Sequence, residues 1–168
     1  MVLPKKYKKN KKKILNLIDK SISSGSIFFG KNLTKFEKNF TTKYNSRYGI
    51  AVGSGTDALL ISLMAIGIKK GDEVITAANT AIPTISAIIS SGARPVLVDI
   101  NNDDYLININ DLENKITKRT KVIIPVHLYG QSANMKKIIV MSKKYKIHII
   151  EDCAQAQGAM YNNKFVGT

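Results

Sequence analysis

The stretch Ile149-Ile150-Glu151-Asp152-Cys153-Ala154-Gln155 holds the residues of this sequence that are best suited to chemistry. Two apolar residues precede a Glu-Asp pair, which predicts a buried strand that ends by delivering a carboxylate into a crevice, where open α/β sheets bind ligands. Asp152 would there hold a basic ring nitrogen protonated, and Gln155 could reach the opposite edge of the ring. Pyridoxal phosphate (PLP) needs such a partner, because its protonated pyridine is the electron sink for carbanion chemistry. The alternative is an acidic strand end that caps the following helix.

A second candidate is the loop Gly53-Ser54-Gly55-Thr56-Asp57, which lies between a short apolar segment and an apolar helix. Glycines let the backbone approach an anion, and a helix N-terminus offers free N–H groups and a favourable dipole. Thr56 can cap the helix and donate its hydroxyl to a phosphate. The loop is neither a Walker loop nor a GxGxxG fingerprint, so the alternative to a phosphate site is a glycine turn with a cap.

The histidines and the single cysteine form no recognisable metal site. His127 and His148 are far apart in the sequence, and cysteine ligands are absent. His127 lies at a strand end that faces the same crevice, so it is either a substrate contact or a satisfied buried histidine. Cys153 is expected to be a small core residue rather than a nucleophile, and a lone cysteine fits a reducing compartment.

The elements that must position these residues alternate between strands and helices after residue 49, with no further domain boundary. The apolar runs predict five strands, at residues 49–52, 73–77, 95–99, 121–126 and 146–151. The helical spacing of apolar residues predicts four helices between them, at residues 58–66, 82–90, 111–116 and 134–145, the last with Met135, Ile138, Ile139 and Met141 buried. This alternation predicts an α/β fold with a mainly parallel sheet and flanking helices.

Residues 1–48 form a separate region, a basic arm with N-terminal helices. Seven lysines and no acid occur in residues 1–13, in a chain whose net charge is +14. We expect this arm to be a solvated lysine-rich tail, because one aromatic residue and no arginine are poor material for reading bases. Apolar spacing predicts a helix over residues 11–23 that ends at 24–26, and a second helix capped by Asn32.

Composition excludes several classes of protein. At 168 residues, with 44% apolar and 23% charged residues, the chain suits one sizeable globular domain. It contains no apolar run of about 18 residues, and its start lacks the apolar segment of a secretory signal, so no membrane span is expected and a cytoplasmic location is predicted.

Six motifs in order resemble the N-terminal part of the DegT-type nucleotide-sugar aminotransferases, which are fold-type-I PLP enzymes. They are Ser54-Gly55-Thr56-Asp57-Ala58-Leu59, Gly71-Asp72-Glu73-Val74-Ile75, Gly92-Ala93-Arg94-Pro95-Val96, Asp99-Ile100, Pro125-Val126-His127-Leu128-Tyr129-Gly130 and Glu151-Asp152-Cys153-Ala154-Gln155-Ala156. The resemblance runs from about Gly30 to Thr168 and implies that residues 49–168 are an incomplete PLP-binding large domain.

The resemblance also implies roles for single residues. Gly55, Thr56 and Asp57 would hold the PLP phosphate, largely through backbone N–H groups. Asp152 would pair with the pyridinium nitrogen, and Gln155 would donate to O3′ of the cofactor. The implied substrates are keto-sugars on a nucleotide diphosphate, with glutamate as the usual amino donor. The implied assembly is a homodimer, and the implied product is an amino sugar for polysaccharide biosynthesis.

Three departures from the family pattern stand out. The family chain is more than twice as long, and its Schiff-base lysine follows the region that ends here, since Lys164 is not at that position. Many members stack an aromatic side chain on the ring near Asn79-Thr80, where this chain has Ala81 as the cofactor-lining residue. Gln157 occupies a position often held by histidine. Because the chain lacks the Schiff-base lysine, the chain alone is expected to be inactive.

The alternative to an aminotransferase is a binding protein without catalytic activity. It would be a remnant that keeps a phosphate-binding crevice, or a protein that binds nucleic acid through its basic arm, in which case binding would weaken steeply with salt. A dehydrogenase is disfavoured because no Rossmann glycine fingerprint is present.

Overall fold

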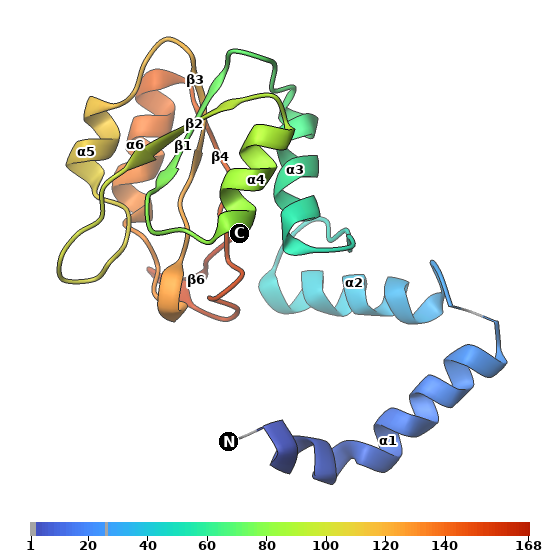
Figure 1. Cartoon of the computed structure of the whole chain (residues 1–168). Helices are drawn as coiled ribbons and strands as arrows, with labels where there is room; N and C mark the ends of the chain where they lie inside the picture. Colours follow the sequence, from blue (N-terminus) through green and yellow to red (C-terminus); the bar gives the residue numbers. More distant parts are fainter. Residues whose placement is uncertain (1–2, 26) are drawn as a thin grey trace. The chain divides into compact units, whose positions relative to one another are not determined.

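The structure is a computed structural model that describes every residue except 1, 2 and 26 (Figure 1). The chain divides into two compact units, one ending at Ala51 and the other running from Val52 to Thr168. The helices are α1 (Leu3–Ser23), α2 (Lys31–Tyr44), α3 (Gly55–Ile66), α4 (Ile82–Ser90), α5 (Ile109–Asn114), α6 (Met135–Tyr145) and the 3-10 turn η1 (Leu128–Gly130). The strands are β1 (Glu73–Ala77), β2 (Arg94–Val98), β3 (Thr120–Ile124), β4 (His148–Ile149), β5 (Met160–Tyr161) and β6 (Lys164–Phe165). None of the described helices is long and apolar enough to cross a bilayer.

The first unit holds two amphipathic helices. α1 begins at Leu3 rather than at residue 11, so most of the lysine-rich arm is helical. Residue 26, expected within the stop after this helix, lies outside the described residues. The predicted cap of α2 is wrong: Gly30 is the N-cap residue, and Asn32 instead donates through Nδ2 to Ser21 Oγ at 3.0 Å. This side-chain bond ties α2 to the end of α1.

The strand predicted at residues 49–52 is not formed among the described residues. Residues 49–51 instead lie against α2, where Oε1 of Glu37 accepts a hydrogen bond from Ala51 N–H at 2.9 Å. The approach is close enough that a β-carbon on Gly49 would lie 2.8 Å from Thr41 Cγ2. The apolar run thus finds no strand partner, and Ile50 is 82% exposed.

The second unit is built on a four-stranded sheet with the order β2-β1-β3-β4, in which every pair is parallel. The prediction of a mainly parallel α/β sheet is therefore confirmed. β1, β2 and β3 lie within two residues of their predicted bounds. The strand predicted at 146–151 is shorter than expected, because only His148 and Ile149 form regular strand pairs with β3, although single hydrogen bonds continue beyond Ile149.

Helices cover both faces of this sheet, with α3 and α4 on one side and α5 and α6 on the other (Figure 1). Alternating strand residues serve the two cores: Val74 and Val122 pack with α3 and α4, while Ile75 and Ile123 pack with α5 and α6. In α6 the residues Met135, Ile138 and Met141 are buried as predicted, but Ile139 is 42% exposed, so that part of the prediction is wrong.

The last segment forms an antiparallel hairpin that the sequence did not indicate. β5 pairs with β6, and Met160 lies opposite Phe165. Asn162 and Asn163 both have positive φ in the turn, as two-residue hairpin turns favour. The hairpin follows the Glu-Asp stretch directly and returns the chain toward it, since Gly167 donates to Glu151.

Candidate functional site

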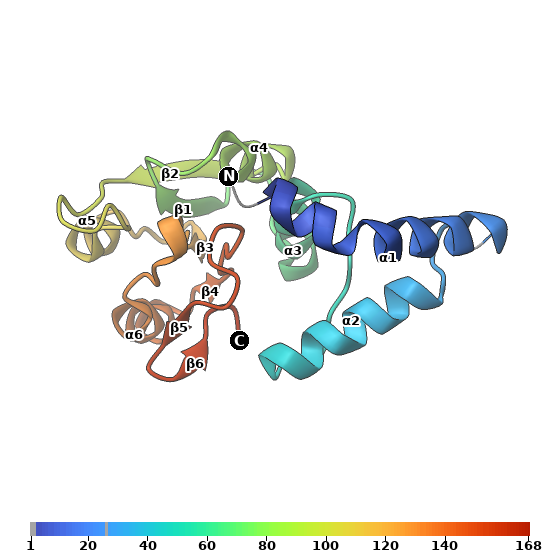
Figure 2. The same cartoon turned by 90° about the horizontal axis from the view of Figure 1, so that it is seen from below.

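The candidate site residues lie at the carboxyl edge of the parallel sheet. The chain leaving β3 and the chain leaving β4 stay paired there through a parallel bridge between Val126 and Asp152. The N-termini of α3 and α4 lie at the same edge, which Figure 2 views from below. This edge is where parallel α/β sheets bind ligands, as the sequence predicted for Asp152.

Asp152 is held through both carboxylate oxygens. Oδ1 accepts a hydrogen bond from Ala154 N–H at 3.1 Å, and Oδ2 accepts one from the Thr84 hydroxyl at 3.2 Å. Thr84 is 1% exposed and accepts in turn from the Thr80 hydroxyl at 2.9 Å. No helix follows Asp152 among the described residues, so the alternative role as a helix cap is not observed.

Gln155 is oriented by the backbone of the turn that follows β3. Its Oε1 accepts a hydrogen bond from Tyr129 N–H at 3.2 Å. The amide nitrogen Nε2 has no partner in the described part of the chain, so it is a free donor on an exposed side chain. The neighbouring Gln157 donates to Ala154 O at 2.6 Å and stabilises the turn between them.

The glycine loop forms a capped helix start. Ser54 is the N-cap residue of α3: its Oγ accepts from Asp57 N–H at 3.1 Å and donates to Asp57 Oδ2 at 2.9 Å. The prediction that Thr56 caps the helix is therefore wrong, because Thr56 lies inside the first turn. The N–H groups of Gly55 and Thr56 have no acceptor among the described residues, so these two are the amides that an anion can use.

Ala81 is the N-cap residue of α4, and it makes no side-chain capping bond. It is exposed, so the chain between β1 and α4 presents a methyl group where a ring could stack. Thr84 follows three residues later in the first turn of α4, which links this loop to Asp152.

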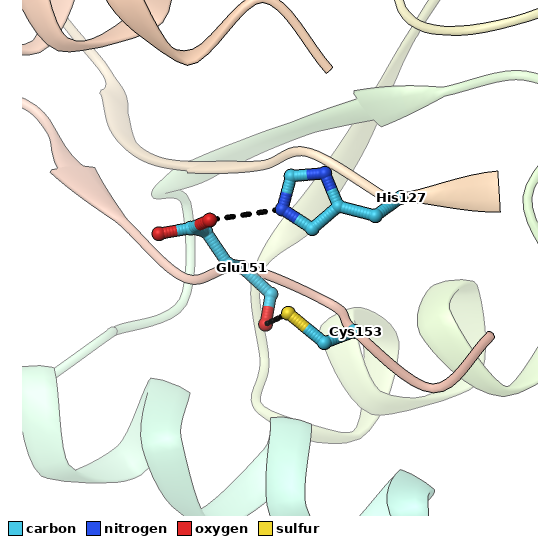
Figure 3. A group of neighbouring side chains, drawn as sticks. All are labelled: His127, Glu151 and Cys153. Atoms are coloured by element: carbon cyan, nitrogen blue, oxygen red, sulfur yellow. Dashed lines mark hydrogen bonds and ion pairs between the residues drawn. The ribbon is translucent and has the colours of Figure 1, made fainter. Parts of the chain in front are cut away.

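His127, Glu151 and Cys153 form a cluster beside this edge (Figure 3). His127 is fully buried, Nδ1 accepts from Ala133 N–H at 3.0 Å, and Nε2 donates to Glu151 Oε2 at 2.9 Å. No ring nitrogen is left for a substrate, so the structure shows the satisfied buried histidine rather than the substrate contact. Ligand atoms of the three residues lie within 4.8 Å of one another, but the cluster is satisfied without an ion.

Cys153 has no nucleophilic character in this environment. Burial raises the pKa of its thiol to about 12, and the negative charges of Glu151 and Asp152 add to the effect. A thiol with so high a pKa is almost wholly protonated near neutral pH and reacts slowly. Cys153 was expected to be a small core residue, but it is half-buried, and only the expectation that it is not a nucleophile agrees with the raised pKa.

Sequence reasoning missed the residues that hold the expected ones in place. Thr80 precedes the N-cap of α4 and Thr84 lies in its first turn, and only the tertiary fold brings these two hydroxyls to Asp152. The backbone N–H of Tyr129 could not be predicted as the partner of Gln155, because its availability depends on the positive φ of 59° in η1.

The residues at this edge suit a phosphorylated, ring-containing cofactor. A fixed carboxylate, a free amide donor and two unpaired N–H groups at a helix start offer an acceptor, a donor and an anion site. These match what PLP presents: a ring nitrogen that accepts a proton, a ring oxygen and a phosphate.

Comparison with known proteins identifies the family to which the chain belongs. The model of the DegT/DnrJ/EryC1/StrS aminotransferase family matches residues 8–168. A dTDP-3-amino-3,6-dideoxy-alpha-D-galactopyranose transaminase from Aneurinibacillus thermoaerophilus is 45% identical over 157 residues, which are 94% of this chain and 43% of that protein. The chain therefore spans about two fifths of the length of this relative.

Solved structures agree in fold. DesV from S. venezuelae matches with a TM-score of 0.95 and 34% identity, over 99% of this chain and 45% of that one. The ntda protein from Bacillus subtilis, solved with the bound cofactor pyridoxamine phosphate (PMP), matches with a TM-score of 0.89 and 39% identity, over 94% of this chain and 36% of that one. The sheet and helices are thus part of a fold-type-I aminotransferase domain.

Proposed function

The chain belongs to the DegT/DnrJ/EryC1/StrS aminotransferase family, and from this premise we propose that the whole protein transfers an amino group from glutamate to a nucleotide-linked keto-sugar. Its cofactor would be PLP, and its product an amino sugar for polysaccharide biosynthesis in the cytoplasm. The sequence similarity to a dTDP-sugar transaminase supports the substrate class. The observation that carries the proposal is the Asp152 carboxylate, fixed at the carboxyl edge of the sheet by Thr84 and Ala154.

Four groups of this chain would hold the cofactor. The N–H groups of Gly55 and Thr56 would bind the phosphate, supported by the dipole of α3. Asp57 would contribute by holding Ser54 in the cap, since its own N–H already donates to Ser54 Oγ. Asp152 would accept from the ring nitrogen, and Nε2 of Gln155 would donate to the ring oxygen.

When bound, PLP supplies an electron sink that stabilises negative charge next to the amino nitrogen. The contribution of this chain is to keep that sink protonated. An ionised Asp152 next to the ring nitrogen favours the protonated ring by charge and by a charge-assisted hydrogen bond. Thr84 and Ala154 donate to the same carboxylate and fix its orientation.

The resemblance places the Schiff-base lysine outside the motifs found in residues 1–168, so the covalent step belongs to the whole protein. A homodimer is part of the proposal, with glutamate and the nucleotide sugar as the small-molecule partners. The net charge of +14 suits a substrate that carries a diphosphate.

The direct test uses PMP, because it carries its own amino group and needs no covalent bond to the protein. We expect the chain to bind PMP in a fluorescence or calorimetric titration. Asp152→Asn should weaken binding by about ten- to a hundredfold, which corresponds to the loss of a hydrogen bond to a charged group. Asp72→Asn is the control, because Asp72 lies in the turn before β1, at the opposite end of the sheet.

Two results would speak against the proposal. One is a wild-type chain that binds no PMP, and the other is an Asp152→Asn variant that binds PMP as tightly as the wild type. For the reaction itself, the whole protein would be incubated with PLP, glutamate and dTDP-linked keto-sugars, and the aminated sugar nucleotide sought by mass spectrometry.

A further inference from the structure

The buried ring of His127 is hydrogen-bonded to two groups that together determine which ring nitrogen carries the proton. Ala133 N–H donates to Nδ1 at 3.0 Å, so that nitrogen is an acceptor without a proton. The proton of the neutral ring then lies on Nε2, where it is donated to Oε2 of Glu151 at 2.9 Å (Figure 3). The hydrogen bond on one nitrogen decides the state of the other. In this arrangement His127 donates to Glu151 through Nε2.

The same oxygen of Glu151 accepts a second hydrogen bond, from Gly167 N–H at 3.0 Å. Gly167 has a φ of +81°, and a β-carbon there would lie 3.0 Å from Cys153 Sγ. A larger residue at this position would be strained by the backbone conformation and would need Cys153 Sγ to shift. One carboxylate oxygen therefore joins the end of β3, the end of β4 and the segment after β6.

Backbone bonds connect this junction to Asp152. His127 N–H donates to Asp152 O at 3.0 Å, and Asp152 N–H donates to Pro125 O at 3.0 Å. The Glu151-Asp152 dipeptide is thus held by a side chain at its first residue and by the backbone at its second. A change in the backbone dihedrals of Glu151 would turn the peptide that leads to Asp152.

We propose that His127 and Glu151 are positioning residues: their hydrogen bond fixes the Glu151-Asp152 dipeptide against the end of β3 and so sets the direction of the Asp152 carboxylate. Glu151 acts as a double hydrogen-bond acceptor, and its negative charge is not required. The inference rests on the proposed function, because it assigns Asp152 to the cofactor ring.

The experiment compares two substitutions of Glu151. Glu151→Gln keeps an oxygen that can accept from His127 and Gly167 but removes the charge, whereas Glu151→Leu removes both hydrogen bonds. PMP affinity is measured by titration, and the exchange of the Asp152 and Gly167 amides is followed by NMR without cofactor. The chain has two histidines, so His148→Gln, at the exposed histidine of β4, leaves His127 alone in long-range proton–nitrogen spectra.

We expect Glu151→Gln to bind PMP within about threefold of the wild type and Glu151→Leu to bind about tenfold more weakly. The amides of Asp152 and Gly167 should exchange about tenfold faster in Glu151→Leu only, because their protection depends on these bonds. The spectra of His127 should show a proton on Nε2 and none on Nδ1.

Three results would overturn the inference. They are equal losses of PMP affinity in the Gln and Leu variants, unchanged affinity and amide exchange in the Leu variant, and a proton on Nδ1 of His127. If the Leu variant does not fold, the PMP affinity of the Gln variant and the His127 spectra test the inference. If the wild-type chain binds no PMP but amide exchange follows the expected pattern, the proposed function fails and the positioning of the dipeptide stands.

Discussion

The hydroxyl of Thr84 lies 3.2 Å from Oδ2 of Asp152 and donates a hydrogen bond to it across 68 positions of sequence. Thr84 is buried in the first turn of α4 and Asp152 is half-buried, so the bond is partly shielded from water. The first turn of α4 thereby supports the position of the carboxylate after β4.

Replacing Thr84 tests this support. We expect Thr84→Val to weaken PMP binding by about three- to tenfold, because the carboxylate loses one donor and a neutral hydrogen bond contributes about 1 kcal/mol. Thr84→Ser keeps the hydroxyl and should restore most of the affinity. The measurement is a PMP titration of both variants, and equal affinities for Val and Ser would contradict the role of the hydroxyl.

A substitution at Gln155 separates its two functions. Gln155→Glu keeps an oxygen that accepts from Tyr129 N–H but removes the donor Nε2. We expect PMP affinity to fall by about tenfold or more, because a second acceptor would face the ring oxygen. Gln157→Glu, in the neighbouring turn, is the matched control, and a similar loss in both variants would show that added charge and not the lost donor is responsible.

Ala81 offers a gain-of-affinity test. Because Ala81 is exposed at the start of α4, an aromatic ring fits there without displacing core residues. We expect Ala81→Phe to tighten PMP binding by about two- to tenfold, since an aromatic pair contributes about 0.5–1.5 kcal/mol beyond area burial. Ala81→Leu, which adds apolar area without a ring, controls for simple burial, and an equal gain with leucine would exclude stacking.

The raised pKa of Cys153 predicts slow thiol chemistry. With a pKa of about 12 against an ordinary 9.0, the thiolate fraction at pH 8 is about a thousandfold below that of an exposed cysteine. We expect alkylation by iodoacetamide to be slower by a similar factor and to accelerate about tenfold per pH unit up to pH 10. Unfolding in urea should abolish the difference. Rapid alkylation of the folded chain at pH 7 would show that the thiol is neither buried nor protonated.

The local patterns of the second unit predicted its elements well. β1 and α4 have the predicted bounds, because each is a short apolar run closed by clear turn signals such as Gly92, whose φ is +86°. Asp152 was expected at the carboxyl edge of the sheet and lies there, because an apolar run before a Glu-Asp pair fixes where a buried strand ends.

Predictions failed where a distant partner decides the local structure. Residues 49–51 have the apolar pattern of a strand, yet the Glu37 side chain takes the N–H of Ala51. Thr56 has the right chemistry for a cap, but Ser54 lies at the position where the backbone is extended, with φ −158°. The contacts from Thr84 to Asp152 and from Tyr129 to Gln155 come from α4 and η1, far away in the sequence, so no local pattern indicates them.

The amino end of the sheet depends on a buried carboxylate. Glu73 begins β1, is 2% exposed, accepts from the Thr117 hydroxyl and pairs with Arg119 Nη2 at 2.9 Å. The hydrogen bond from Thr117 holds the pKa of Glu73 below its usual value of 4.5, and the charges of Arg119 and Arg94 act in the same direction while burial opposes it. Its stabilising contribution is thus present above about pH 4.5 and is lost as pH falls through the lowered pKa.

Glu73→Gln should therefore lower the free energy of unfolding by about 1–3 kcal/mol at pH 7, because hydrogen bonds to a charged group are lost. The difference between variant and wild type should shrink as pH falls below 4.5, since the wild-type carboxyl then becomes protonated as well. Thermal melts followed by circular dichroism between pH 3 and pH 7 measure both effects. Glu113→Gln is the matched control, because its ion pair with Lys144 lies at the surface, where such pairs contribute about 0–1 kcal/mol. A difference for Glu73→Gln that stays constant from pH 7 to pH 3 would show that shape, and not the ionised carboxylate, matters at this position.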